Sequence, residues 1–301
     1  MRVGVTGSSG FIGAALTTAL EARGDDVVRF VRPSSTTQGA TRVRWDPDAG
    51  EVDDMDLAHA GTLDAVVNLA GAGIADRRWS TDRQREILES RTKSTALLAR
   101  TLRSSNTTPF FVSGSAIGYY GSRGDELLDE NSSHGSDFLA DVCVRWEAAA
   151  NDVVAGAGIA FLRTGIVMSR HGGALKKQLA LFRAGLGGRL GDGRQWLSPI
   201  SLSDEIRGIL YVLDNRIDGP VNLCAPTPLT NADFTRALGR QLHRPTFATV
   251  PVVALRVVLG AALTEGAVLA SQRVEPTVLK ERGFNFQHHD VTAILRAALT
   301  S

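Results

Sequence analysis

Short apolar runs alternate with longer amphipathic segments through the first half of the chain. Runs rich in Val predict strands, whereas apolar residues every three or four positions predict helices. The expected strands are 3–5, 27–31, 65–69, 110–113 and 160–163, and the expected helices are 14–23, 83–102 and 137–150. Strands separated by helices indicate βαβ units, whose right-handed crossovers build a parallel sheet with helices on both faces. The pattern therefore predicts a Rossmann-type, doubly wound α/β fold.

The periodicity changes after residue 169, where closely spaced glycines interrupt it. These glycines are at positions 172, 173, 185, 187, 188, 191 and 193. We expect a mobile loop around a ligand, and a plain glycine-rich connector is the alternative. Beyond it, a strand is expected at 221–223 and a helix at 231–242. The longest apolar stretch, 250–270, carries Arg256 and Glu265 and predicts one or two packed helices rather than a membrane span.

These patterns predict two parts. Residues 1–168 are expected to form the dinucleotide-binding Rossmann domain, to which 196–223 return. Residues 169–195 and 224–301 are expected to form a smaller, mostly helical substrate lobe. We find no repeat and no low-complexity linker, so the two parts are expected to be closely fused.

A G-x-x-G-x-x-G motif occupies 7–13, directly between the first expected strand and the first expected helix. That context is typical of a phosphate-binding loop. The first glycine permits the tight turn, the second lets the backbone approach a pyrophosphate, and the third allows close packing of helix on strand. The predicted contacts with a dinucleotide are Gly7, Ser9, Gly10, Phe11, Ile12 and Gly13. A simple strand-to-helix turn is the alternative.

The end of the second strand bears on the choice between NAD and NADP. An NAD site usually has an acidic residue there for the ribose 2′-hydroxyl. Here the strand ends in Arg32, and the two acids nearby, Asp25 and Asp26, precede the strand. A guanidinium suits a 2′-phosphate because its fork binds two oxygens. We therefore predict NADP(H), with a solvated arginine as the alternative.

A later strand closes with Leu69, Ala70 and Gly71. Ala70 and Gly71 are small enough for a ribose or flat ring to pass close to the backbone. Ser113 and Val167, near the ends of two further strands, complete this predicted group of cofactor contacts.

Composition narrows the function. The 301 residues are 43% hydrophobic, and the net charge is +1, so no broad basic field favours nucleic acid or an anionic membrane as a partner. Cys143 and Cys224 lie far apart, which argues against a disulfide framework or a zinc site. No signal peptide is recognisable, and we expect a cytoplasmic protein without a bound metal. Whether it forms a homodimer stays open.

Several motifs together resemble a known family. They are VTGSSGFIG at 5–13, VNLAGA at 67–72, ESR at 89–91, SAIGYYG at 115–121, WEAA at 146–149, RTGIV at 163–167 and VNL at 221–223. With these motifs, the chain is similar to extended short-chain dehydrogenases/reductases. More narrowly, it resembles the NAD-dependent epimerase/dehydratase-like, cell-division-inhibitor-like sugar-nucleotide epimerase branch. The segment from 231 to 284 resembles the C-terminal part of that branch.

The resemblance implies a catalytic Tyr, a Lys four residues later, a Ser and an Asn. In this chain the Tyr position aligns with Leu139, the Lys position with Cys143 and the Asn position with Arg91. Only the Ser is retained, as Ser115. None of the three tyrosines is followed by Lys at the fourth position, so the usual proton-transfer pair is absent.

Substitutes are available for this chemistry. Ser115 is expected to orient a substrate oxygen, with Tyr119 or Tyr120 as proton donor, although packing against the nicotinamide or the core is the alternative for both rings. A tyrosine needs a nearby cation to act at neutral pH. Arg91 is expected to supply it and to contact the cofactor, oriented by Glu86; a surface charge paired with a neighbouring acid is the alternative.

Two functions remain open at this stage. The first is an NADP(H)-dependent epimerase or reductase acting on a sugar-nucleotide-like or other small polar substrate. The second is a non-catalytic NADP(H)-binding sensor or partner-binding protein, because the proton-transfer pair is missing. The sequence offers no recognisable substrate clamp beyond Arg163, Arg189 and Arg194.

Overall fold

The computed structural model describes residues 1–35, 41–104, 108–150 and 158–300. Its centre is an eight-stranded sheet in the order β13-β8-β6-β5-β1-β2-β3-β4. The strands are β1 (Arg2–Thr6), β2 (Asp26–Val31), β3 (Arg42–Asp46), β4 (Glu51–Val52), β5 (Ala65–Asn68), β6 (Phe110–Ala116), β8 (Ile159–Thr164) and β13 (Gly219–Leu223). All neighbours pair in parallel except β4, which runs antiparallel to β3. The predicted doubly wound parallel sheet is confirmed.

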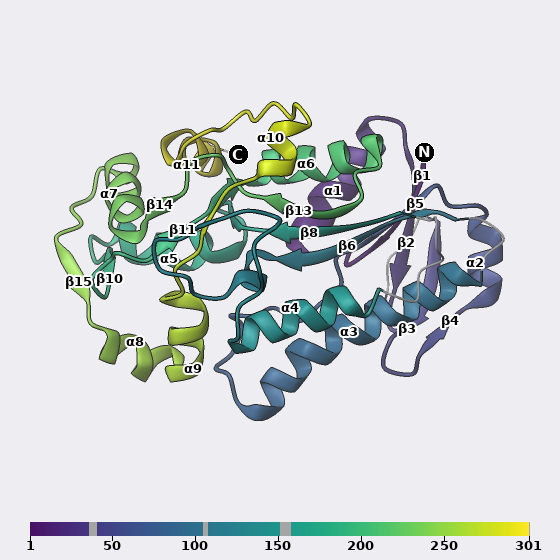
Figure 1. Cartoon of the computed structure of the whole chain (residues 1–301), viewed down its shortest axis with the longest axis horizontal. Helices are drawn as coiled ribbons and strands as arrows, with labels where there is room; N and C mark the ends of the chain where they lie inside the picture. Colours follow the sequence, from purple (N-terminus) through teal and green to yellow (C-terminus); the bar gives the residue numbers. More distant parts are fainter. Residues whose placement is uncertain (36–40, 105–107, 151–157, 301) are drawn as a thin grey trace.

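Helices cover both faces of the sheet (Figure 1). The helices α1 (Phe11–Ala22) and α6 (Leu202–Asn215) lie on one face, and α3 (Thr81–Arg103) and α4 (Phe138–Ala148) lie on the other. Adjacent residues of β2 enter opposite cores, because Val27 packs in the core of α1 and Val28 packs in the core of α3. Burial on both faces explains why the strands are continuously apolar rather than alternating.

The strand order reverses at β1, with β2 on one side and β5 on the other. The loops that follow β1 and β5 therefore diverge at the carboxyl ends of the strands. Open α/β sheets bind ligands at such a switch point. The glycine motif and Leu69–Ala70–Gly71 follow these two strands, so the fold brings the two predicted cofactor segments to one place.

A second region lies at one end of the sheet (Figure 1). Three helices share a core there: α5 (Gly173–Arg183), α7 (Asn231–Leu242) and α11 (Val291–Thr300). Short strand pairs join it to the rest: β9 (Ile166–Met168) with β12 (Pro199–Ser201), β10 (Gly188–Leu190) with β15 (Ala248–Val250), β11 (Trp196–Leu197) with β14 (Leu229–Thr230), and β7 (Leu127–Leu128) with β16 (Arg273–Val274). The remaining elements are α2 (Asp54–Ala60), η1 (Ile117–Tyr120), α8 (Val252–Leu259), α9 (Ala261–Leu263), the π-helical turn η2 (Thr264–Val268) and α10 (Thr277–Glu281).

The predicted mobile loop was wrong, because most of the glycine-rich stretch forms α5 and β10. Leu175, Leu179 and Phe182 are buried on one face of α5, which is the spacing of an amphipathic helix. The sequence reading also missed β3, β4 and α2. The other expected strands and helices are confirmed with ends that differ by a few residues, and 250–270 forms short helices. Among the described helices, none has the length and apolar character needed to cross a membrane.

Candidate functional site

The glycine motif forms the turn between β1 and α1. Gly7 has a φ of +62°, which glycine adopts without strain, and a Cβ there would lie 2.7 Å from the carbonyl oxygen of Leu69. A Cβ on Gly13 would collide with the backbone of Gly7. Beside Gly10, by contrast, the carbonyl oxygen of Gly7 at 3.1 Å is the one close atom. The fold itself thus requires Gly7 and Gly13, whereas Gly10 leaves room for a ligand.

No capping side chain accepts a hydrogen bond from the first-turn amides of α1. Helices α3, α4 and α6 differ, because Ser80, Asp137 and Ser201 cap them through their side-chain oxygens. The uncapped first turn offers amide donors and the positive end of a helix dipole beside the exposed Gly10. These are the features that bind a diphosphate, so the loop fits the predicted dinucleotide.

Buried hydrogen bonds fix the loop after β5. The Thr6 hydroxyl donates to Oδ1 of Asn68 at 2.7 Å, and Nδ2 of Asn68 donates to the Thr95 hydroxyl at 2.8 Å. The amides of Leu69 and Ala70 donate to the Thr6 oxygen at 3.1 and 3.2 Å. The second cofactor segment is therefore held rigidly next to the glycine loop.

A cavity of about 780 Å³ opens between these loops, the end of β2 and α3. Its lining includes six of the predicted cofactor contacts: Gly7, Ser9, Arg32, Ala70, Gly71 and Glu86. The other predicted contacts do not line it: Gly10, Phe11, Ile12, Gly13, Leu69, Arg91, Ser113 and Val167. Trp45 and Asp48, which the sequence reading did not select, also line the cavity because the unpredicted β3 lies beside β2.

Several of the predicted contacts outside the cavity have other partners. The Phe11 ring lies against Gly172 at the start of α5. Val167 is buried in β9, opposite Ile200 of β12. Ser113 is fully buried, and its hydroxyl donates to the carbonyl of Gly114 at 3.2 Å.

Arg32 lies at the end of β2 as predicted, but two acids hold it. Its Nη1 lies 3.0 Å from Oδ1 of Asp46 and 3.0 Å from Oδ2 of Asp48. The sequence reading considered the acids around β2 and missed these two, which follow the next strand. The guanidinium is about half exposed, so its exchange of a carboxylate for a phosphate is sterically open.

Arg91 is buried, so the interpretation as a surface charge was wrong. Its Nη1 donates to the carbonyls of Ala72 at 3.0 Å and Ile87 at 2.9 Å. The guanidinium lies over the ring of Trp146, 5.0 Å from its centroid. Burial lowers the pKa of Arg91 to about 10, which still leaves the group charged at neutral pH.

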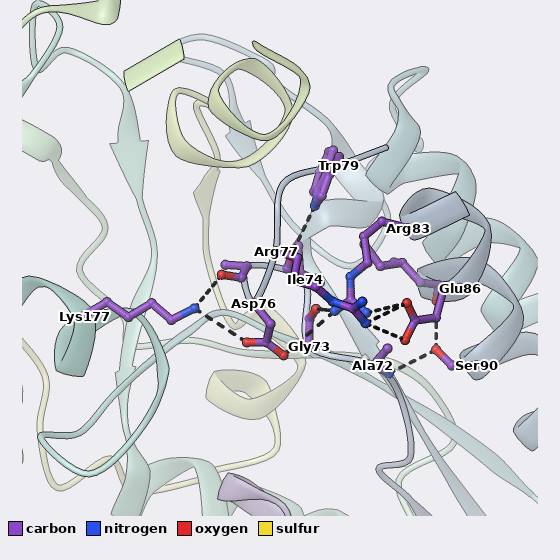
Figure 2. Close-up of polar contacts among 12 residues, drawn as sticks. Ala72, Gly73, Ile74, Asp76, Arg77, Trp79, Arg83, Glu86, Ser90 and Lys177 are labelled. Atoms are coloured by element: carbon purple, nitrogen blue, oxygen red, sulfur yellow. Dashed lines mark hydrogen bonds and ion pairs between the residues drawn. The ribbon is translucent and has the colours of Figure 1, made fainter. Parts of the chain in front are cut away.

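The expected pairing of Glu86 with Arg91 was also wrong. Glu86 pairs with Nη1 of Arg83 at 2.7 Å and with Arg77 at 3.2 Å (Figure 2). Arg83 also donates to the carbonyl of Gly73, so it anchors the segment 72–79 against the start of α3. From the other side, Nζ of Lys177 in α5 approaches Asp76 at 3.6 Å (Figure 2). This segment thus links the sheet domain to α5.

Ser115 lies near the carboxyl end of β6 and belongs to a buried polar network. Its hydroxyl donates to Oε1 of Glu147 at 2.7 Å. Arg163 pairs with both oxygens of the same carboxylate, Nε with Oε1 at 2.9 Å and Nη2 with Oε2 at 3.0 Å. Arg163 is therefore committed to Glu147 and is not a free substrate clamp. Glu147, which the sequence analysis included only within the WEAA motif, is the residue that orients Ser115.

The two tyrosines of η1 differ in accessibility. The Tyr120 hydroxyl is fully buried, donates to Oδ1 of Asn222 at 2.7 Å and accepts from Nη1 of Arg163 at 3.1 Å. Burial raises the pKa of Tyr120, which disfavours it as a proton donor to a ligand. The Tyr119 ring is half-buried, and its centroid lies 3.5 Å from the guanidinium carbon of Arg163. Arg163 rather than Arg91 is thus the cation in contact with the tyrosines in the described part of the chain.

Leu139 and Cys143, the positions expected to align with the usual Tyr and Lys, lie beside η1. A Cβ on Gly118 would lie 3.5 Å from Cβ of Leu139 and 3.6 Å from Sγ of Cys143, so both side chains pack beneath η1. Burial raises the pKa of the Cys143 thiol to about 12, and the thiol is inert at neutral pH. Among the described residues, no cluster of His, Cys, Asp or Glu has an arrangement that could hold a metal ion.

Comparisons with known proteins show the family of the chain. Residues 3–224 match the model of the NAD dependent epimerase/dehydratase family, and residues 250–298 match a domain of unknown function, DUF1731. An epimerase family protein of Mycobacterium bovis is 42% identical over 301 residues, which cover 99% of this chain and 97% of that protein. The human epimerase family protein SDR39U1 is 35% identical over 304 residues, which cover 98% of this chain and 99% of that protein.

Solved structures of epimerase-family proteins are also similar to this chain. The crystal structure of human SDR39U1 isoform 2 with NADPH superposes with a TM-score of 0.88 and 33% identity over the full length of both chains. A nucleoside-diphosphate sugar epimerase from Corynebacterium glutamicum superposes with a TM-score of 0.78 and 35% identity, covering 99% of this chain and 58% of that one.

Proposed function

The chain belongs to the NAD dependent epimerase/dehydratase family, and from this premise we propose that it is an NADP(H)-dependent epimerase or reductase of a small polar substrate. The observation that carries the proposal is the switch-point crevice, where an uncapped α1, an open Gly10 and a rigid loop after β5 adjoin a cavity of about 780 Å³. A bound nicotinamide dinucleotide would supply hydride-transfer chemistry there.

Arg32 supports NADP(H) over NAD(H). A 2′-phosphate would replace Asp48 or Asp46 as the partner of an exposed guanidinium that already lies at the cavity wall. The human relative was crystallised with NADPH. The acids that hold Arg32 weaken the preference, because the 2′-phosphate must compete with them, and we therefore expect a moderate rather than a large selectivity.

Ser115 and Tyr119 are the residues proposed to act on the substrate. Because the Ser115 proton is committed to Glu147, the Ser115 oxygen presents lone pairs and accepts a hydrogen bond from a substrate hydroxyl. The Tyr119 hydroxyl has no hydrogen-bond partner in the described part of the chain, and we assign it the proton transfer. Tyr120 stays outside the reaction, as its hydroxyl is sealed within the protein.

A non-catalytic NADP(H)-binding protein is the second candidate. It is supported by Leu139 and Cys143, which pack beneath η1 at the positions expected to hold the usual Tyr and Lys and transfer no proton at neutral pH. In that case Tyr119 and Ser115 would serve binding alone. The two candidates share the cofactor site and differ only in turnover.

Transfer of a label from the cofactor separates the candidates. NADPH deuterated at either face of nicotinamide C4 is incubated with the protein and a panel of carbonyl metabolites that also carry a hydroxyl group, and products are examined by mass spectrometry. We expect a deuterated alcohol, whose formation falls by about 10²-fold or more in Ser115→Ala and Tyr119→Phe. Tyr211→Phe is the matched control, because the Tyr211 hydroxyl donates to the carbonyl of Arg282, away from the crevice. NADPH binding without deuterium transfer to any carbonyl would favour the second candidate.

A further inference from the structure

Arg91 is a buried cation whose charge no acid of the described residues neutralises by an ion pair. Its side chain is 8% exposed. Glu86 is occupied by Arg83 and Arg77, and Glu147 is occupied by Arg163 and Ser115. A buried charge without a partner costs several kcal/mol, so a protein rarely retains one without a use.

The hydrogen bonds of Arg91 leave one edge of the guanidinium free. Nη1 donates to the carbonyls of Ala72 and Ile87, and the flat face lies on Trp146. Within the described part of the chain, Nε and Nη2 of Arg91 donate no hydrogen bond. Neither atom is completely buried, whereas Nε of Arg83 is buried without a partner. These two parallel donors form the fork that pairs side-on with a planar carboxylate.

Arg91 lies next to the cofactor cavity, because Gly71, which lines that cavity, borders its guanidinium. A Cβ on Gly71 would lie 3.2 Å from the Arg91 guanidinium carbon, so Gly71 allows the approach of Arg91 to the end of β5. Trp146 lies against Gly114, which precedes Ser115 on the neighbouring strand β6. Arg91 is therefore held between the carboxyl ends of two adjacent strands, on the side of the switch point where Ser115 is.

We propose that Arg91 binds a carboxylate of the substrate through Nε and Nη2. This proposal rests on the proposed function, since it places the substrate beside a dinucleotide in the adjoining cavity. A single guanidinium edge suits the two oxygens and single charge of a carboxylate. A phosphate group carries more charge and more oxygens than this one edge can satisfy. The proposed substrate is therefore a sugar-nucleotide-like or other small polar molecule that carries a carboxylate.

The test uses the protein saturated with NADPH and malonate as a probe. Malonamide, its neutral analogue of the same shape, is the matched ligand control. Binding is measured by isothermal titration at constant ionic strength, for wild type, Arg91→Met, Arg91→Lys and Arg145→Met. Arg145 is the control position, because it is exposed on α4 and pairs only with Asp141 among the described residues.

We expect malonate to bind wild type at least tenfold more tightly than Arg91→Met. Arg91→Lys should lie between them because it keeps the charge and loses the fork. Arg145→Met should match wild type, malonamide should not bind, and NADPH affinity should stay within threefold in every variant. Equal malonate affinity in wild type and Arg91→Met would overturn the proposal, and so would tighter binding of inorganic phosphate than of malonate.

Two results separate this inference from the proposed function. Loss of NADPH affinity in Arg91→Met would assign Arg91 to the cofactor and remove the carboxylate site while leaving the proposed function intact. Failure of wild type to bind NADPH or NADH would instead remove the proposed function. Arg91→Lys keeps the inference testable should Arg91→Met fail to fold.

Discussion

The Ser115 hydroxyl donates to Oε1 of Glu147 at 2.7 Å, and the same carboxylate is clamped by Arg163. One acidic side chain on α4 therefore sets the orientation of a hydroxyl on β6 and neutralises a buried arginine on β8. Its replacement should affect stability as well as any reaction.

Glu147→Gln should lower the free energy of unfolding by about 3 kcal/mol, because Arg163 is left buried without a carboxylate. The double variant Glu147→Gln/Arg163→Met should recover part of that loss, since no unpaired charge remains. Urea unfolding monitored by circular dichroism measures both. A single variant within 0.5 kcal/mol of wild type would show that the pair is not structurally important.

Arg32→Ala should weaken NADPH binding by about 10- to 100-fold and leave NADH binding unchanged, since a charge-assisted hydrogen bond contributes on the order of 1.5–3 kcal/mol. Asp48→Asn should have the opposite effect and tighten NADPH binding, because it releases one competitor for the guanidinium. Fluorescence titration of wild type and both variants with NADPH and with NADH tests these two expectations. Equal affinity of wild type for NADPH and NADH would contradict the assignment of Arg32.

Gly10→Val should abolish cofactor binding while the fold persists, because the added side chain enters open space where the diphosphate binds. Gly13→Val is the contrasting variant and should disrupt the fold, as its Cβ meets the backbone of Gly7. Cofactor titration with thermal unfolding distinguishes the two effects. Normal NADPH binding by Gly10→Val would show that the phosphate site lies elsewhere.

The parallel sheet and the phosphate loop could be predicted because their signals are local. A mostly apolar run such as 27–31, next to a segment with helical periodicity, is typical of a buried strand. Three glycines at fixed spacing between the two segments predict the turn that joins them. The short strand β3 was missed because Arg42 and Arg44 alternate with Val43 and Trp45 over only five residues. Helix α5 was missed because flanking glycines outweighed the stripe of Leu175, Leu179 and Phe182.

The side-chain partners at the site could not be predicted for a different reason. Glu147 meets Ser115 across 32 residues, and Asp48 meets Arg32 only because β3 lies beside β2. Arg91 lies on the long helix where the sequence placed it. Its burial depends on Trp146 and on the absence of a side chain at Gly71, both distant in sequence. Contacts of this kind follow from the tertiary fold, and no local pattern indicates them.

Arg91→Met should leave the free energy of unfolding of the ligand-free protein unchanged or raise it. Methionine removes an unpaired buried charge and still fills space against Trp146, and such replacements are often neutral or stabilising. A purely structural arginine would behave in the opposite way, through loss of its bonds to Ala72 and Ile87. Thermal unfolding without cofactor measures the sign, and a loss above about 2 kcal/mol would assign Arg91 a structural role.

Glu205 should make the protein less stable as the pH rises. This carboxyl is fully buried in the first turns of α6, Thr164 donates to its Oε1 at 2.9 Å, and its Oε2 has no partner among the described residues. Burial raises the pKa of Glu205 to about 8, well above the value of an unfolded chain. The folded state then binds the proton more tightly, so its stabilisation is complete below about pH 4.5. This stabilisation is lost progressively until the pH passes 8.

Glu205→Gln keeps the hydrogen bond from Thr164 without a titrating group. The substitution should flatten the pH dependence of the free energy of unfolding and stabilise the protein most at pH 8 to 9. Urea unfolding of both proteins between pH 5 and 9 provides the measurement, and parallel profiles for the two would show that Glu205 is ionised in the folded state.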